Sequence, residues 1–484
     1  MSAANSHPTP DLPDGLVAVV KRSCPTCEMI APVLAQIAGA GVDLTVVSQD
    51  DPGFPAGLEA VDDRTLELSY RLKIDIVPTL LRLDRGAEAE RAIGWRRDEW
   101  ETLSGVGGLG PELVSWQAGC GSLSVEPGVA ERLEARYGTS LEARRVELGS
   151  AEDEHEALFE RGWTDGLPAV PPTPERVLRM LGGTDRPGDE VVGTVPPNMA
   201  PCSVEKAAIN AVMAGCKPEY FPVVLGAVEA ACRDEFGLHG LLATTMSHGP
   251  VAIVNGPLAR RIGMGSGINL LGQGNRANST IGRALQLVVR NVGGGRPGEV
   301  DRATFGNPGK IGLCFAEDEE GSPWEPLSVE RGFPPGASTV TLFGGEGPRL
   351  VVDQLSRAPE SLAASFAACL KTVIHPKLPL AFDALLVVSP EHARVFRDAG
   401  WSKARLRREL MQRLMLPGAE IARGAGGVAE GVPEEMRDQT LPKFRPGGLL
   451  IVHAGGSAGL FSAIIGGWVN GEMGTNPVTV EIHP

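Results

Sequence analysis

Two cysteines separated by two residues open the most informative segment of this chain, Cys24-Pro25-Thr26-Cys27-Glu28-Met29-Ile30-Ala31-Pro32. An apolar, β-branched run at residues 16–20 precedes it and is typical of a buried parallel strand. Apolar residues then recur at helical spacing as far as Gly39 and Gly41. The sequence therefore predicts a strand, a turn and a helix, with the CxxC pair at the N-terminus of that helix.

This position favours thiol–disulfide chemistry. Backbone N–H groups and the helix dipole stabilise a thiolate at a helix N-terminus, so we expect Cys24 to be the more exposed, attacking thiol. Cys27 is its expected partner in a redox-active disulfide, and the sequence predicts no other cofactor with certainty. No second CxxC and no histidine cluster accompanies the pair, so we predict no metal site.

Two motifs in this order resemble the thioredoxin family. Residues 24–32 look like its active-site helix with the mid-helix proline, and Ile76-Val77-Pro78-Thr79 followed by Gly86 is similar to its cis-proline segment. The resemblance covers roughly residues 15–105 and implies a thioredoxin-like fold. It also implies that Pro78 is cis, packs beside the CxxC pair and holds a substrate backbone.

Two departures from the thioredoxin pattern bear on activity. Ser23 stands where thioredoxins usually have Trp, and Ala18 stands where they carry a buried acid that helps to deprotonate the second cysteine. General disulfide reduction is therefore expected to be slow, which favours a dedicated partner. An inert scaffold is the alternative reading of this domain.

Composition and charge limit the class of protein. The chain has 484 residues, of which 42% are hydrophobic and 22% charged, and this balance is typical of a globular protein with several domains. Its net charge of −15 argues against nonspecific binding of nucleic acid or anionic lipid. We find no run of 18 apolar residues and no signal peptide, so we expect a cytoplasmic protein with no membrane partner.

The expected fold class is α/β throughout: a thioredoxin-like fold, then a large Gly-rich α/β or α+β region that forms either one domain or two subdomains. The expected boundaries are a disordered tail at 1–14, the thioredoxin-like domain at 15–110, a connector at 111–153, and the large region at 154–345 and 346–484. Short helices are expected in the connector at residues 130–136 and 141–145. No internal repeat is evident.

Two further cysteines are candidate catalytic residues. Cys120 lies between glycines in the connector, where it is either a mobile thiol that visits the CxxC pair and a downstream site, or a small residue in a tight turn. Cys202 falls at or near the start of a helix that runs to Gly215, so its thiol pKa should be lowered, as in a nucleophile. The alternative for Cys202 is a buried capping residue.

A candidate anion site lies in the large region, around residues 272–283. Ser279 suits the N-cap of a helix over 280–291, so the free N–H groups at Thr280 would converge with the side chains of Arg276 and Asn278. The alternative is that these side chains only tie down the loop. Further ligand-binding candidates are Arg283, Asp301 and Lys310.

In three segments of the large region an expected strand ends in glycines. These are residues 250–256, 339–345 and 449–456. A strand that feeds a glycine turn and then a helix is how α/β folds often build ligand sites. The glycines at 293, 295 and 298 formally match a dinucleotide fingerprint, but a helix precedes them and none follows, so we reject that reading. Glu317 and Glu319 either supply charge to a site or are solvated loop residues.

The large region resembles a bacterial protein family to which no reaction is assigned. The resemblance rests on residues 161–168, 276–283 and 322–326 and covers most of residues 154–484. Some members of that family carry a small domain with selenocysteine or a Cys-Gly-Ser-Cys motif in place of the thioredoxin-like part. The resemblance therefore implies that a redox-active chalcogen is repeatedly joined to this large domain.

These observations favour a thiol-dependent oxidoreductase in which the CxxC domain supplies electrons to a reductive reaction on a small anionic substrate in the large region. A cellular thiol/disulfide reductase is expected to recharge the pair, and a homo-oligomer is a further expectation. One alternative is a thiol protein that binds or detoxifies soft metals, metalloids or organometals. Another is a ligand-binding protein regulated by the redox state of the pair.

Overall fold

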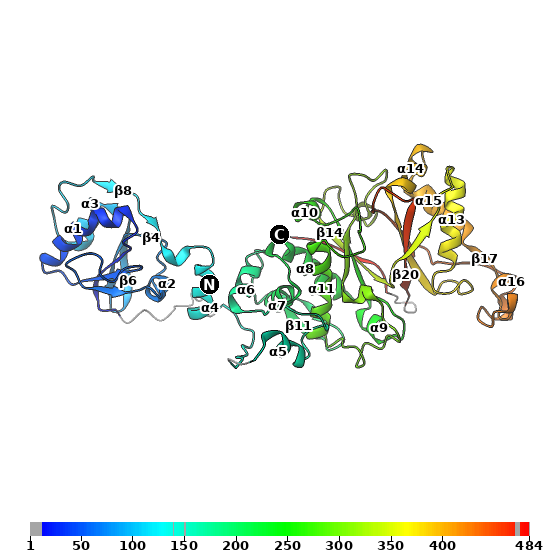
Figure 1. Ribbon diagram of the computed structural model, residues 1–484, viewed down its shortest axis with the longest axis horizontal. Coiled ribbons are helices and arrows are strands. Elements are labelled where there is room, and N and C mark those ends of the chain that lie inside the picture. The colour runs from blue at the N-terminus through cyan, green and yellow to red at the C-terminus, as the bar shows by residue number, and fades with distance from the viewer. Residues whose placement is uncertain (1–11, 139, 150–151, 470–474, 484) are drawn as a thin grey trace. The chain divides into compact units, whose positions relative to one another are not determined.

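The computed structural model describes residues 12–138, 140–149, 152–469 and 475–483. Most of the expected N-terminal tail (1–14) lies outside these residues. The chain divides into two compact units, Met1–Leu141 and Glu142–Pro484, and each contains both helices and sheets (Figure 1). The α/β class is therefore confirmed.

The N-terminal unit contains a five-stranded sheet in the order β3-β2-β1-β5-β6. The central strand β1 is parallel to β2 and antiparallel to β5, and β3 is parallel to β2. The strands are β1 (Gly15–Val20), β2 (Leu44–Ser48), β3 (Ala60–Asp62), β4 (Ile76–Val77), β5 (Thr79–Asp84), β6 (Ala87–Ile93), β7 (Trp95–Arg96), β8 (Trp116–Gln117) and β9 (Cys120–Gly121). The helices are α1 (Pro25–Gly39), α2 (Glu67–Arg71), α3 (Arg97–Ser104), η1 (Leu123–Val125) and α4 (Val129–Tyr137).

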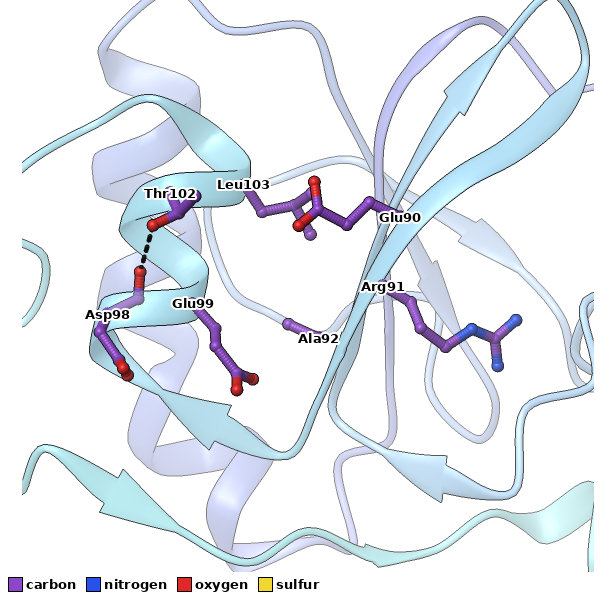
Figure 2. Close-up of a pocket in the computed structure, with 7 residues that line it drawn as sticks. All are labelled: Glu90, Arg91, Ala92, Asp98, Glu99, Thr102 and Leu103. Carbon is purple, nitrogen blue, oxygen red and sulfur yellow. Dashed lines mark hydrogen bonds between the residues drawn. The ribbon is translucent and has the colours of Figure 1, made fainter.

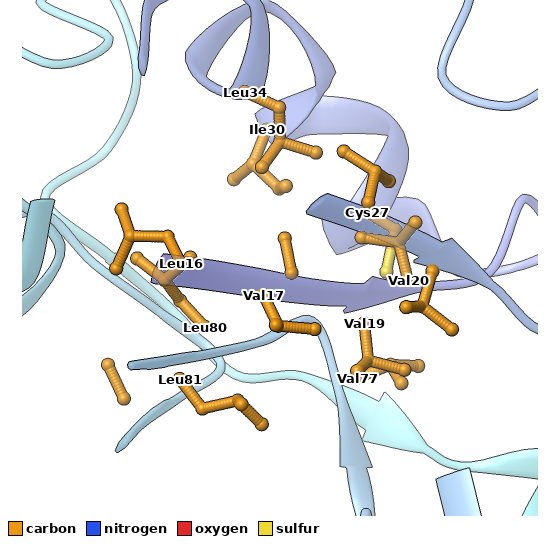
Figure 3. Close-up of a cluster of buried hydrophobic side chains, with 14 of the residues drawn as sticks. Leu16, Val17, Val19, Val20, Cys27, Ile30, Leu34, Val77, Leu80 and Leu81 are labelled. Atoms are coloured by element: carbon orange, nitrogen blue, oxygen red, sulfur yellow. The ribbon is translucent and has the colours of Figure 1, made fainter. Parts of the chain in front are cut away.

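The core of this unit lies between the sheet and α1. Ile30 and Leu34 of α1 are fully buried against Val17 and its neighbours in β1, which has no exposed apolar residue after Gly15. Figure 3 shows the Cys27 side chain among these apolar groups, close to Val20. The apolar run at 16–20 and the helical stripe after Cys27 therefore form the elements that their spacing predicts.

The chain does not leave this unit after α3 but folds back over it. We call residues 114–122 the return segment. Within it β8 pairs with β7, and β9 pairs with β4. The expected connector therefore belongs, as far as Leu141, to the N-terminal unit. The helix expected at 141–145 is absent: these described residues are irregular, and the backbone N–H groups of Glu142 and Ala143 bind the Glu205 carboxylate instead.

The C-terminal unit is built on an eight-stranded sheet in the order β13-β12-β14-β20-β16-β19, with β15 beside β20 and β21 beside β14. Two small sheets, β10-β11 and β17-β18, lie outside it. The strands are β10 (Val191–Val195), β11 (Ala200–Ser203), β12 (Gly249–Asn255), β13 (Leu313–Ala316), β14 (Thr339–Gly345), β15 (Arg349–Val352), β16 (Phe382–Val388), β17 (Met415–Pro417), β18 (Thr440–Pro442), β19 (Leu449–His453), β20 (Phe461–Trp468) and β21 (Val478–Glu481).

Helices cover this sheet in two groups. Figure 1 shows α7, α8 and α11 near β14, and α13, α14 and α15 near β20. The helices are α5 (Glu154–Glu160), α6 (Pro174–Leu181), α7 (Val204–Ala214), η2 (Pro218–Tyr220), α8 (Phe221–Ala231), η3 (Asp234–Phe236), α9 (Leu238–Ala243), α10 (Pro257–Arg261), α11 (Arg276–Asn291), η4 (Pro308–Ile311), α12 (Leu327–Glu330), α13 (Pro359–Lys371), α14 (Pro390–Asp398), α15 (Lys403–Arg413), α16 (Gly418–Ile421), η5 (Ala425–Gly427) and η6 (Glu434–Met436).

The large sheet repeats one arrangement of strands. In the first copy β12 is parallel to β13 and antiparallel to β14, and in the second β16 is parallel to β19 and antiparallel to β20. The two copies meet where Gly345 pairs with Gly467. Any Cβ at Gly345 would lie 2.7 Å from the side chain of Ile465, so the close approach requires glycine. The expected boundary at 345/346 falls between the copies, but both belong to one sheet and one compact unit.

Two local expectations in this unit are wrong. Gly344 and Gly345 are the last residues of β14 rather than a turn, and β19 leads to β20 rather than to a helix, so only β12 runs through a glycine into a helix. The helix expected to start at Thr280 begins four residues earlier, with Asn275 as its N-cap. The Asn275 side chain accepts a hydrogen bond from the N–H of Asn278, and this contact fixes the earlier start.

Candidate functional site

The CxxC pair begins α1 as expected. Cys24 is the N-cap residue, Pro25 occupies the first helical position, and Cys27 lies on the buried face. The Cys24 thiol is 3.5 Å from the carbonyl oxygen of Val77, to which it donates. The peptide between Val77 and Pro78 is cis, as the resemblance implies. The sequence-predicted residues Cys24, Cys27 and Pro78 are thus brought together at the junction of α1 and β4.

The return segment lies against this junction and is held on both sides. The Thr26 hydroxyl donates to the carbonyl of Ala118 at 2.7 Å, and the Lys21 ammonium donates to the carbonyl of Gly121 at 2.7 Å. Further along, the indole N–H of Trp95 donates to the carbonyl of Val114 at 2.7 Å. These three bonds join the segment to Lys21 before the CxxC pair, to Thr26 between its two cysteines, and to β7.

Cys120 is placed beside Cys24 by strand pairing. In the antiparallel β4–β9 ladder, Cys120 stands directly opposite Val77, whose carbonyl Cys24 contacts. Gly119 allows this approach, because any Cβ there would lie 2.6 Å from the Val77 oxygen and 2.4 Å from the Ile76 side chain. The structure therefore places Cys120 beside the CxxC pair, as one interpretation of the sequence required. It lies there in a short strand of the same unit rather than in a tight turn.

The three thiols have different acidities. Burial acts to raise the pKa of Cys24, but hydrogen bonds from the Cys120 thiol and from the N–H and thiol of Cys27 outweigh it, so the pKa is lowered. The pKa of Cys27 is raised, chiefly by burial. The pKa of Cys120 is raised because its thiol hydrogen-bonds to Cys24 and because it is partly desolvated. Cys24 is thus the most acidic of the three thiols, because the pKa of each neighbouring thiol is raised.

The expectation that Cys24 is the more exposed thiol is wrong. Cys24 and Cys27 are both 0% exposed, whereas Cys120 is partly exposed. The reason is the return segment, which covers the start of α1. Exposure and acidity therefore belong to different thiols in this site: the pKa of Cys24 is lowered, whereas Cys120 is the thiol that reaches the solvent.

Cys202 does not have the predicted properties of a nucleophile. Its side chain is fully buried, and burial raises its pKa to about 12. The N-cap of α7 is Ser203, whose hydroxyl accepts the N–H of Lys206, and the Cys202 thiol donates to the Ser203 carbonyl. The prediction of a lowered pKa is therefore wrong, because burial outweighs the nearby helix start.

The predicted anion-binding side chains all make contacts within the unit. Arg276 donates twice to the carbonyl of Gly215, at 3.0 and 2.9 Å, and remains exposed. Asn278 binds both the N–H and the carbonyl of Gly265, and the Thr280 hydroxyl donates to the carbonyl of Arg276. The convergence of free N–H groups at Thr280 is not found, because Thr280 is the fifth residue of α11. An anion site at these residues stays a prediction.

The remaining candidates form ion pairs. Arg283 binds both oxygens of Asp165 at 2.8 Å, and it also donates to the carbonyls of Leu167 and Pro168. Lys310 pairs with Asp301 at 2.7 Å. Each of these side chains joins separate segments of the C-terminal unit.

A buried polar group lies where β12, β13 and β19 end. The Glu317 carboxylate accepts the amide N–H of Asn255 at 2.7 Å and lies 3.9 Å from the ammonium of Lys403. Burial raises the pKa of Glu317. Asn255 Oδ1 and His453 Nε2 are buried and have no hydrogen-bond partner among the described residues. The sequence reading of Glu317 as a solvated loop residue is therefore wrong.

A pocket opens elsewhere on the N-terminal unit, between β6 and α3. Glu90 and Ala92 line it from the strand, and Asp98, Glu99 and Thr102 line it from the helix (Figure 2). Its three carboxylates make it acidic. The residues that line the pocket include none of the three cysteines.

Sequence reasoning missed Lys21, Thr26 and the pairing of the return segment. Lys21 lies three residues before Cys24 and Thr26 lies between the two cysteines, so their proximity was visible, but their partners lie more than 90 residues away. The only signal in the return segment was Cys120 itself. Contacts over such distances along the chain follow from the tertiary fold.

Comparisons with known proteins add no relative. No protein-family model matches the chain, and a search of the curated proteins finds no significant match. Among the described residues, no group of three or more His, Cys, Asp or Glu side chains is arranged to hold a metal ion. No helix in the described ranges is long and apolar enough to cross a membrane.

Proposed function

We propose that this chain is a thiol–disulfide oxidoreductase in which Cys24 and Cys27 cycle between dithiol and disulfide. In the reduced state the Cys24 thiolate attacks a disulfide, and Cys27 resolves the resulting mixed disulfide. The observation that carries this proposal is the difference in acidity between the two thiols, because an attacking thiol needs thiolate character at neutral pH and a buried neutral thiol resolves afterwards.

The surroundings of the pair support the same proposal. The sheet order, the cysteine pair at the start of α1 and the cis peptide before Pro78 agree with the thioredoxin-like fold that the two motifs imply. Residue 18 is an alanine that is fully buried in β1, so this position offers no carboxylate to take the proton of Cys27. Resolution by Cys27 is therefore expected to be slow unless a substrate or partner supplies the base.

We extend the proposal to the C-terminal unit as the place where the electrons are used, on a small anionic substrate. The region around Arg276 remains one candidate for binding it, since both hydrogen bonds of this exposed side chain go to an uncharged carbonyl. The buried group around Glu317 is a second candidate. A cellular thiol/disulfide reductase would recharge the CxxC pair.

The test is a redox titration of the full chain. The protein is equilibrated with mixtures of reduced and oxidised dithiothreitol, free thiols are blocked with an alkylating reagent, and the Cys24–Cys27 disulfide is quantified in peptides by mass spectrometry. We expect one two-electron transition at this pair. Cys369→Ser, which changes a partly buried cysteine of the C-terminal unit, is the matched control and should titrate like the wild type.

Two outcomes would overturn the proposal. One is that no Cys24–Cys27 disulfide forms in the most oxidising mixture while the protein stays folded. The other is that Cys24→Ser still reduces a disulfide substrate such as insulin at the wild-type rate. In either case the CxxC pair would be a structural feature of α1.

A further inference from the structure

The CxxC site contains a third thiol whose position no part of the two-cysteine cycle explains. Cys120 stands opposite Val77 in the β4–β9 ladder, and the Cys24 thiol contacts the carbonyl of that same Val77. Directly opposed residues of an antiparallel pair have Cβ atoms about 5 Å apart. The return segment thus presents a cysteine to Cys24 at the edge of β4.

Contacts of the neighbouring residues fix the position of Cys120. Gly119 fits against Val77 only without a side chain, Thr26 holds Ala118, and Lys21 holds Gly121. The Lys21 ammonium also lies close enough to favour a negative charge on Cys120.

Exposure gives Cys120 a role that Cys24 does not have. Cys24 and Cys27 are fully buried, and Cys120 is the partly exposed thiol of the three. A disulfide outside the chain therefore meets Cys120 before it meets Cys24, as long as the return segment stays in place. The lower pKa of Cys24 agrees with a thiolate that is ready to attack Cys120.

We propose that Cys120 is a third redox-active cysteine, which exchanges with Cys24 through an in-chain Cys24–Cys120 disulfide and carries electrons between the buried pair and a disulfide outside. This inference rests on the proposed cycling of Cys24 and Cys27. It adds a catalytic residue to that cycle and makes the return segment part of the redox site.

The steps balance for an external disulfide R–S–S–R. Cys120, whose thiol is neutral at rest, loses its proton and attacks one sulfur; a mixed disulfide forms, and the first R–S⁻ leaves and takes up that proton. The Cys24 thiolate then attacks Sγ of Cys120, which releases the second R–S⁻ and forms the Cys24–Cys120 disulfide. Cys27 loses its proton and attacks Sγ of Cys24, and Cys120 leaves and is reprotonated. Two thiols are oxidised and one external disulfide is reduced.

The experiment uses the full-length Cys27→Ser variant, in which the cycle stops before its last step. The reduced protein is treated with oxidised glutathione, free thiols are blocked, and disulfide-linked peptides are mapped by mass spectrometry. We expect the Cys24–Cys120 disulfide, with no glutathione left on Cys24. In the Cys27→Ser/Cys120→Ser variant this product is lost. Cys27→Ala repeats the test, in case the serine hydroxyl destabilises the core.

A rate measurement separates the role of Cys120 from a passive one. In the variant with only Cys120→Ser, formation of the Cys24–Cys27 disulfide by oxidised glutathione should become several-fold slower than in the wild type and in Cys369→Ser. An unchanged rate would show that the outside disulfide reaches Cys24 directly, and this would overturn the inference.

The outcomes also distinguish this inference from the proposed function. If the wild type forms the Cys24–Cys27 disulfide but Cys27→Ser keeps glutathione on Cys24 with Cys120 free, Cys120 is not redox-active and the two-cysteine cycle stands. If the wild type forms no Cys24–Cys27 disulfide, the proposed function itself fails. Circular dichroism of each variant verifies that the unit is folded.

Discussion

At the scale of single residues, neighbours determine the chemistry more than sequence position does. Cys24 and Cys202 both lie next to the start of a helix, yet the pKa of Cys24 is lowered and that of Cys202 is raised to about 12. The difference is that Cys24 accepts hydrogen bonds from two thiols and two backbone N–H groups, whereas burial is the main influence on Cys202. Donors that point at the sulfur offset the cost of burying a thiolate.

Replacing Cys120 should therefore change the acidity of Cys24. In Cys120→Ala the thiol that donates to Cys24 is lost, and the pKa of Cys24 should rise, since a hydrogen bond to a charged sulfur stabilises the thiolate. The pH dependence of Cys24 alkylation by iodoacetamide, followed by peptide mass spectrometry, measures the shift. An alkylation profile equal to that of Cys369→Ala would contradict the role given to Cys120.

Replacing Arg276 tests whether this side chain, which is predicted to bind an anion, also stabilises the C-terminal unit. In Arg276→Ala both hydrogen bonds to Gly215 are lost, and the C-terminal unit should lose about 1 kcal/mol of stability. Arg260→Ala is a suitable control, because Arg260 only pairs with the exposed Glu320. Thermal melting measures the effect. An unchanged melting temperature in Arg276→Ala would mean that the contact with Gly215 adds nothing and that the side chain is free to bind an anion.

At the scale of elements, the return segment is the feature that covers the CxxC pair at the start of α1. Its two short strands add to β7 and β4, and neither has more than two residues. The segment therefore depends on a few side-chain contacts and on the absence of a side chain at Gly119. Displacing it should change the access to Cys24 more than it changes the core.

Gly119 and Gly121 provide a matched pair of substitutions. A Cβ at Gly119 would lie 2.4 Å from the Ile76 side chain, whereas one at Gly121 meets nothing within 4 Å. We expect Gly119→Ala to displace the segment, to cost about 1–3 kcal/mol by overpacking, and to make Cys24 react faster with iodoacetamide. Gly121→Ala should behave like the wild type. Equal Cys24 reactivity in the two variants would show that the segment does not control access.

At the scale of the whole molecule, the chain consists of two units that each have their own core. Trp95 and Trp100 pack edge to face in the N-terminal core, with ring centroids 5.4 Å apart. In the C-terminal unit Phe366 and Phe396 belong to a cluster around β16 and β20, and a second cluster lies around β12 and β19. Units with separate cores are expected to unfold in separate transitions.

Core substitutions in each unit should therefore act on one transition only. Trp100→Ala and Phe366→Ala each remove a fully buried aromatic side chain, which costs about 3–5 kcal/mol. Scanning calorimetry of the full chain should show two transitions, the first variant lowering one of them and the second variant the other. If both variants shifted a single common transition, the two units would unfold as one.

Sequence patterns were sufficient to predict the helices and strands that follow from local periodicity. The apolar run at 16–20, the helical stripe after Cys27 and the strand at 449–453 all gave elements close to their observed bounds, because strand and helix periodicity reflect which face is buried. Helix starts were less accurate: α11 begins at Arg276 rather than Thr280, since Asn275 and Ser279 are both good capping residues and only the packing selects one.

By itself, then, the sequence determined the α/β class, the helix that carries Cys24 and Cys27, and the segment around Pro78. It did not determine the environment of any thiol. The burial of Cys24, the neutral state of Cys202 and the place of Cys120 opposite Val77 were decided by tertiary structure. The physical reason is that strand pairing and desolvation depend on residues far apart in the chain, and the sequence alone does not specify which of these meet.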